Sequence, residues 1–199
     1  FWLSGLASGF AMQMRQIARG WLVYGISGSP LALAVVVSSM GVTMTLLSPI
    51  GGTIADRLSK RRILFATNLT VCLSNLLVAF LISQDLVQLW HLFLISSVDG
   101  VFNALNLPSR QGIIPSLVSR NHLVNAVALS RGAMNLSRIA APALAGLLIP
   151  LIGLRGAYLI ISFCFAVAAV SVVPLTVSGT NVGDWREWHL SREVFKGLR

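Results

Sequence analysis

Residues 51–62 read GGTIADRLSKRR, and this stretch indicates how the chain on both sides of it is arranged. It separates two long apolar segments, 31–55 and 63–83. The glycines permit a tight turn, and the acid Asp56 can accept hydrogen bonds from the N-terminus of a neighbouring helix. The basic residues that follow anchor the turn at one surface of a membrane. We therefore expect a short polar turn between two antiparallel membrane helices.

Apolar segments of similar length recur along the whole chain. Of its 199 residues, 55% are hydrophobic and only 11% are charged, far below the share of about a quarter that is usual in soluble domains. A bilayer core about 30 Å thick requires roughly 20 mainly apolar residues per helix. Six segments meet this requirement: 1–26, 31–55, 63–83, 88–108, 122–151 and 156–175. The sequence predicts an all-α membrane protein with a six-helix transmembrane bundle over residues 1–175.

The basic residues that produce the net charge of +9 do not indicate a nucleic-acid partner, because they are sorted between alternate connections. Ten Lys or Arg residues lie after the second, fourth and sixth segments, whereas the opposite connections carry only Arg155. The positive-inside rule then places the even-numbered connections and both chain ends in the cytoplasm. Aromatic residues expected at the outer membrane interface are Trp21, Tyr24, Trp90 and Tyr158.

Residues 176–199 differ in character from the apolar segments before them. A polar stretch is followed by residues 184–199, which mix Trp185, Trp188 and Phe195 with charges. We expect a cytoplasmic loop followed by a short amphipathic helix on the membrane surface, with a disordered tail as the alternative. Because Phe1 opens within an apolar segment and is not Met, we also expect the sequence to start inside a longer chain.

Two motifs resemble those of the major facilitator superfamily. The stretch 51–62 is similar to its signature loop, Gly-x-Leu-Ala-Asp-Arg-x-Gly-Arg/Lys-Arg/Lys, with Ile54 in place of the leucine and Ser59 in place of the second glycine. The residues that match the loop are Gly52, Ala55, Asp56, Arg57, Lys60 and Arg61. The fifth segment partly matches the antiporter motif Gly-Pro-x-x-Gly-Gly at Ala141, Pro142 and Gly146, which would allow a kinked, closely packed helix.

The segment from 107–111 through 135–139, and the stretch 18–24 before Gly28-Ser29-Pro30, resemble the transmembrane secretion effector branch, which includes enterobactin exporters and macrolide efflux permeases. This resemblance covers essentially the whole chain. It implies the N-terminal half of a permease in a bacterial inner membrane, built as a three-plus-three inverted repeat. It also implies an absent C-terminal half as partner, and a small-molecule substrate exported by alternating access with a proton as coupling ion.

Five ionisable residues lie within the apolar segments: Arg15, Arg19, Asp99, Arg131 and Arg138. An arginine at a helix centre costs about 2.5 to 3.5 kcal/mol on insertion scales, so these faces should point into the bundle or its cavity. Asp99 lies near the midplane. It is either a proton-coupling or substrate site, or the counter-ion of Arg15, Arg131 or Arg138.

The excess of intramembrane positive charge would attract anionic substrates into a cavity. This attraction would weaken if Arg19 extended outward past Trp21 and Tyr24, and Arg131 inward.

The positions of the charged residues also lead to expectations about a gate and about the function of the chain. Asp56 and Arg110, both near cytoplasmic helix ends, are expected to form the ion pair of a cytoplasmic gate that includes the signature loop. No cluster of His, Cys and carboxylates has ligand spacing, and no glycine-rich phosphate loop is present, so we expect neither an enzyme, a metal site nor a cofactor. The alternative to a transporter is a membrane-embedded binding or assembly subunit, or an inert half-permease.

Overall fold

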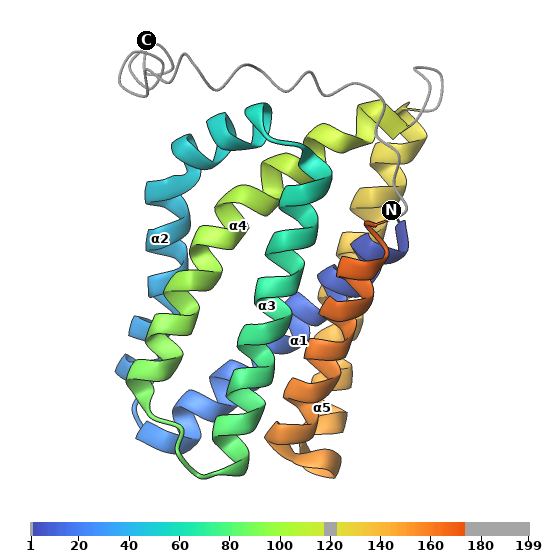
Figure 1. The fold of residues 1–199 in the computed structure, drawn as a ribbon. Coiled ribbons are helices and arrows are strands. Elements are labelled where there is room, and N and C mark those ends of the chain that lie inside the picture. Colours follow the sequence, from blue (N-terminus) through green and yellow to red (C-terminus); the bar gives the residue numbers. More distant parts are fainter. Residues whose placement is uncertain (1, 118–122, 174–199) are drawn as a thin grey trace.

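The computed structural model describes residues 2–117 and 123–173, and the expected tail at 176–199 lies outside this part (Figure 1). The described residues form helices only. These are α1 (Trp2–Ser27), α2 (Pro30–Arg57), α3 (Lys60–Ser83), α4 (Leu89–Leu117) and α5 (Leu123–Val170). The expected all-α architecture is confirmed for this part of the chain.

Short connections join the first four helices, because each carries residues suited to a tight reversal. Gly28 has a φ of 60° two residues before Pro30 opens α2, where the missing N–H of proline is no loss. Only Leu58 and Ser59 separate α2 from α3, so the turn predicted from the stretch 51–62 is present. Asp85, with a φ of 53°, lies in the turn after α3.

α5 contains a reversal that joins two helical arms. Gly153 has φ 72° and ψ 173°, the one non-helical pair of angles inside α5. The chain turns back there, and the arms 123–152 and 154–170 run side by side (Figure 1). The expected break between the fifth and sixth apolar segments therefore falls at Gly153, whereas the backbone stays helical through Pro142.

Three of the helices contain stretches long and apolar enough to cross a membrane: Pro30–Ala55, Lys60–Ser83 and Val127–Val170. α1 and α4 are as long, but Arg15, Arg19 and Asp99 lower their apolar character. The two helices that are least suited to lipid by composition are thus those that carry the buried charges.

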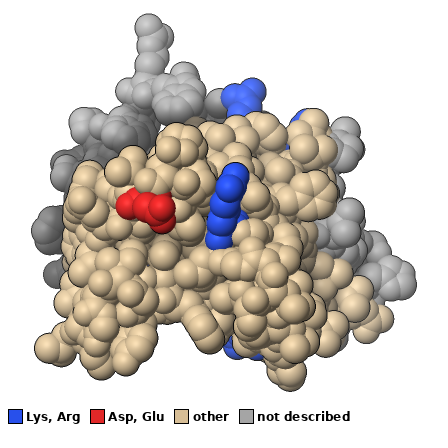
Figure 2. Space-filling view, turned by 90° about the horizontal axis from the view of Figure 1, so that it is seen from below, with Lys and Arg blue, Asp and Glu red and all other residues tan. Residues whose placement is uncertain are grey.

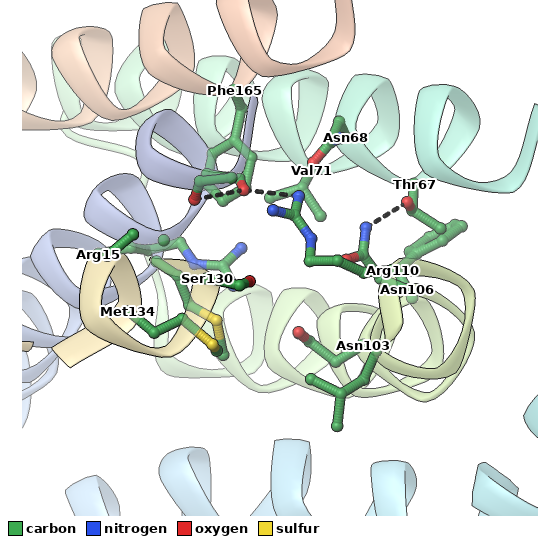
Figure 3. A pocket seen from close by; sticks show the side chains of 17 residues that line it. Arg15, Thr67, Asn68, Val71, Asn103, Asn106, Arg110, Ser130, Met134 and Phe165 are labelled. Atoms are coloured by element: carbon green, nitrogen blue, oxygen red, sulfur yellow. Dashed lines mark hydrogen bonds between the residues drawn. The ribbon is translucent and has the colours of Figure 1, made fainter. Parts of the chain in front are cut away.

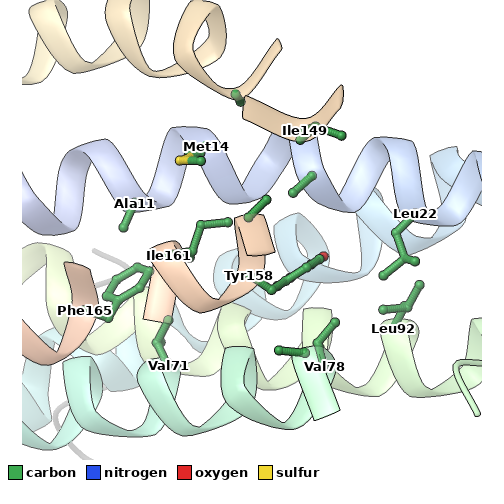
Figure 4. Packing of buried hydrophobic residues seen from close by; sticks show 14 of the residues in the cluster. Ala11, Met14, Leu22, Val71, Val78, Leu92, Ile149, Tyr158, Ile161 and Phe165 are labelled. Carbon is green, nitrogen blue, oxygen red and sulfur yellow. The ribbon is translucent and has the colours of Figure 1, made fainter. Parts of the chain in front are cut away.

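The core lies where α1 packs against α5, with α3 closing one side. Met14 and Ala18 of α1 meet Ala141 and Ala145 of the first arm of α5, and all four are at most 1% exposed. Tyr158 and Ile161 of the second arm and Val71 of α3 complete this layer (Figure 4). The small residues expected at a close helix crossing in the fifth segment are therefore buried against α1.

α2 and α4 form the second close pair, held by glycines that allow backbone contact. A Cβ on Gly51 would lie 2.5 Å from the Ala104 carbonyl oxygen, and a Cβ on Gly100 would lie 2.5 Å from the Met40 carbonyl oxygen. Only 6% of the apolar stretch of α2 is buried, so these crossings are its main attachment to the bundle.

We predict that Gly100→Ala destabilises the protein, because the added methyl group would push α2 away from α4. Overpacking of this kind costs about 1–3 kcal/mol and should lower the midpoint of thermal unfolding in detergent by several degrees. Gly146→Ala is the matched control, since a Cβ there meets no atom within 4 Å. Equal midpoints for the two variants would contradict the proposed contact.

Candidate functional site

A buried ion cluster connects α1 to α4 at the centre of the bundle. The Arg15 Nη1 donates to Asp99 Oδ1 at 2.9 Å. The Arg19 guanidinium contacts the other carboxylate oxygen, Oδ2, and donates from Nη1 to Ser96 Oγ at 2.6 Å. Arg15, Arg19 and Asp99 are 2%, 6% and 0% exposed, respectively. One carboxylate therefore neutralises part of the charge of two guanidinium groups away from solvent.

Helix geometry explains why both arginines reach the same acid. Arg15 and Arg19 are one turn apart on one face of α1, and Ser96 and Asp99 are three residues apart on one face of α4. Asp99 thus has Arg15, one of the three partners expected, and also Arg19, which was not expected. The expectation that Arg19 extends outward past Trp21 and Tyr24 is wrong, because its guanidinium is buried against α4.

Aromatic residues of the second arm of α5 enclose this cluster. The Cζ of Arg15 lies 5.4 Å from the centre of the Phe165 ring, within the range of a cation–π contact. Tyr158 is 1% exposed and lies within electrostatic reach of Arg15, Arg19 and Asp99, with its hydroxyl beside the Arg19 guanidinium. Its expected depth near the outer interface stays a prediction, but its side chain is buried inside the bundle. The position of Tyr158 near the end of an apolar segment did not indicate that its side chain would lie beside the ion cluster.

A cavity of about 80 Å³ lies beside the cluster, between α1, α3, α4 and α5 (Figure 3). Polar groups on its wall include Arg15, Asn68, Asn103, Asn106 and Arg110. Asn106 donates to Thr67 Oγ1 at 2.7 Å, and Arg110 Nη2 donates to Ser8 Oγ at 2.8 Å. The cavity thus joins the arginine of the central cluster to a second arginine nearer the basic end of the bundle.

Arg131 and Arg138 lie apart from this site. Both are exposed along the first arm of α5, on the side turned away from α1, and neither contacts Asp99. Gly146 is exposed on the same arm, whereas Ala141 faces α1. The sequence predicts that both arginines point into the bundle or its cavity; both are exposed on the described bundle, so a cavity role for them stays a prediction.

The signature loop is joined to α4 by a lysine. Lys60 Nζ, at the start of α3, donates to the Gly112 carbonyl oxygen at 2.9 Å. The side chains of Asp56 and Arg57 lie outside the described side chains, so the expected pair of Asp56 with Arg110 stays a prediction. Arg61 and Arg62 lie beside Lys60, whereas the opposite end of the bundle, seen in Figure 2, shows few charged groups on its described surface.

A family profile described as transmembrane secretion effector matches residues 1–199. The chain belongs to this family of the major facilitator superfamily. The match confirms the family predicted from the signature loop, and it agrees with the expectation of an integral membrane protein that is not an enzyme.

Three curated proteins that this chain resembles are transporters. It is 28% identical to the uncharacterized MFS-type transporter YfiS of Bacillus subtilis over 74% of this chain and 34% of the relative. It is 26% identical to the staphyloferrin A transporter of Staphylococcus aureus over 85% of this chain and 43% of the relative. It is 25% identical to the multidrug efflux pump Tap of Mycolicibacterium fortuitum over 88% of this chain and 45% of the relative. The matches span about a third to under half the length of these relatives.

We predict that Asp99→Asn strongly destabilises the bundle, because it leaves two buried guanidinium groups without a counter-charge. Breaking a buried ion pair by removing one partner costs about 3–5 kcal/mol. Asp85→Asn is the matched control, since Asp85 is exposed and Asn tolerates its positive φ. Thermal unfolding in detergent should separate the two variants, and a wild-type midpoint for Asp99→Asn would contradict the energetic role of the cluster.

Proposed function

We propose that this chain forms six membrane crossings of a secondary transporter that exports small molecules by alternating access, coupled to protons. α1 to α4 each supply one crossing, and the two arms of α5 supply the fifth and sixth. The observation that carries the mechanism is the sharing of Asp99 between Arg15 and Arg19 inside the bundle. Export is the direction named for one relative, the multidrug efflux pump.

Helix packing supports an inverted repeat of three crossings. A two-fold axis that exchanges the first three crossings with the last three maps α1 onto α4, and α2 onto the first arm of α5. The contact of α1 with the first arm of α5 would then be equivalent to the contact of α4 with α2, and α1 with both arms of α5, and α2 with α4, are the two most extensive helix pairs. A glycine lies at each contact: Gly9 meets the Ser137 side chain at ordinary van der Waals distance, and Gly51 lies against the Ala104 backbone at closer approach.

The central cluster supports proton coupling through electrostatics. When Asp99 is ionised, its charge holds α1 against α4 through the two arginines. A proton on Asp99 removes that charge, weakens both contacts and leaves two cations that repel each other. Protonation would therefore favour separation of the two helices, and deprotonation would favour their closure. Tyr158 supplies a hydroxyl that one arginine can contact while Asp99 is neutral.

We place the basic end of the bundle in the cytoplasm of a bacterial inner membrane. Lys60, Arg61 and Arg62 lie at this end, as the positive-inside rule requires. The bond of Lys60 to Gly112 ties α3 to α4 there, and in our proposal it forms part of the cytoplasmic gate with Gly52, Asp56, Arg57 and Arg110. The exposed faces of α2 and the first arm of α5, with Arg131 and Arg138, would meet the second half of the transporter.

The test uses the complete reading frame that contains this chain, in inside-out membrane vesicles. Proton release on addition of cationic dyes and anionic chelators is followed with a pH-sensitive fluorophore. Asp99→Asn should reduce solute-driven proton flux about 100-fold or more, because a neutral amide cannot carry the proton, whereas Asp85→Asn should leave it unchanged. Full proton flux in Asp99→Asn would overturn the coupling role. Binding without any flux in the wild type would favour the non-transporting alternative.

A further inference from the structure

We propose that the cavity between Arg110, Asn68 and Arg15 is a binding site for a carboxylate group. It lies inside this helical bundle, on the basic side of the Asp99 cluster, and not on the exposed face where a second half would dock. It would deepen the proposed function by giving the transporter an anionic ligand, and it rests on that function only for the role of the ligand in transport.

Charge balance is the first argument for an anion. Three guanidinium groups, of Arg15, Arg19 and Arg110, lie within or beside the cavity, and Asp99 is the one carboxylate that faces them among the described side chains. Buried arginines are costly in a membrane unless an anion or a set of acceptors surrounds them. Arg15 and Arg19 already share Asp99, so the net positive charge is concentrated toward Arg110.

The hydrogen bonds of Arg110 leave donors available to a ligand. Its Nη2 donates to Ser8 Oγ at 2.8 Å, and Ser8 in turn donates to the Ser4 carbonyl oxygen at 2.7 Å. Arg110 reaches α1 over Gly5, where a Cβ would lie 3.1 Å from its Nη1. A guanidinium has five N–H donors in a planar fork that matches a carboxylate, and Ser8 uses one of them among the described residues.

Asn68 is the second, independent observation. Asn68 lines the cavity and is 2% exposed, yet its Nδ2 has no hydrogen-bond partner among the described residues. An unsatisfied buried amide costs about 1–3 kcal/mol, which an acceptor bound in the cavity would recover. Asn75, two turns along the same helix and also 2% exposed, instead donates to the Val71 carbonyl oxygen at 2.6 Å. Asn103 and Asn106 also line the cavity, but their amides donate to the Asp99 carbonyl oxygen and to Thr67 Oγ1, so Asn68 is the cavity asparagine whose amide nitrogen lacks a partner among the described residues.

Size limits the ligand. A cavity of about 80 Å³ accommodates a carboxylate group but not a large molecule, so the carboxylate either belongs to a small free anion or is the end of a larger solute. Apolar walls from Met12, Val71 and Phe165 suit the carbon attached to the carboxylate.

The test measures thermal unfolding of the purified protein in detergent with acetate, at constant ionic strength set by chloride. Ligands that bind only the folded state raise the unfolding midpoint in a saturable way. We expect acetate to do so, and neutral acetamide and additional chloride not to. Arg110→Lys, which keeps the charge but loses the fork, should weaken apparent acetate affinity about tenfold, and Asn68→Ala about three- to tenfold.

Asn75→Ala is the control and should bind acetate as the wild type does. If Arg110→Lys fails to fold, the apparent acetate affinities of Asn68→Ala and Asn75→Ala still test the site. Equal shifts with acetate and chloride, or unchanged acetate affinity in Asn68→Ala, would overturn the site. Tricarballylate, a larger anion, distinguishes the two possible sources of the carboxylate. A raised unfolding midpoint with both acetate and tricarballylate indicates the carboxylate end of a larger solute. A raised midpoint with acetate alone indicates a small free anion.

The binding experiment requires no transport, so its failure is distinct from failure of the proposed function. If acetate does not bind while proton coupling is intact, the proposed carboxylate site is overturned and the proposed function stands. Acetate binding without any solute-driven proton flux leaves the site in place and removes the coupling.

Discussion

The contact of one carboxylate with two guanidinium groups determines how this bundle is held together. In a medium of low dielectric constant each of these charges would be costly alone, and only their mutual contact makes them tolerable. This requirement fixes the rotation of α1, because Arg15 and Arg19 must face α4, and it fixes the depth of α4, because Asp99 must lie between them. The aromatic residues of the second arm of α5 then exclude water from the contact.

Small residues provide the remaining constraint. Without a hydrophobic driving force between helices in lipid, α2 depends on close backbone contact at Gly51 and Gly100. The pair formed by α1 and α5 uses Ala141 and Ala145 in the same way. Ionic contacts and close packing therefore stabilise different pairs of helices. Charge joins α1 to α4, and packing attaches α5 to α1 and α2 to α4.

Much of this architecture could be predicted from the sequence, because long apolar segments and turn residues are local signals. The turn at 58–59 and the reversal at Gly153 lie where composition indicated breaks. The family followed from the signature loop. The pairing of Arg19 could not be predicted, because the choice between the membrane surface and a buried acid depends on how α1 is rotated against α4. The spacing of Arg15 and Arg19 was the available signal, since residues four apart on a helix can share one partner. The burial of Tyr158 could not be predicted, because segment position does not reveal which residues a reversal brings into the core.

The separation of these charges along the chain also bears on how the protein is made. α1 carries two arginines, at a cost of about 5–7 kcal/mol on insertion scales if they faced lipid, and the acid that neutralises them lies 84 residues beyond Arg15. α2 and α3 are apolar enough to enter a bilayer as soon as they are synthesised. α1 therefore lacks its counter-charge until α4 has been synthesised. Membrane integration of this chain must retain α1 beside the translocation machinery through the synthesis of three further helices.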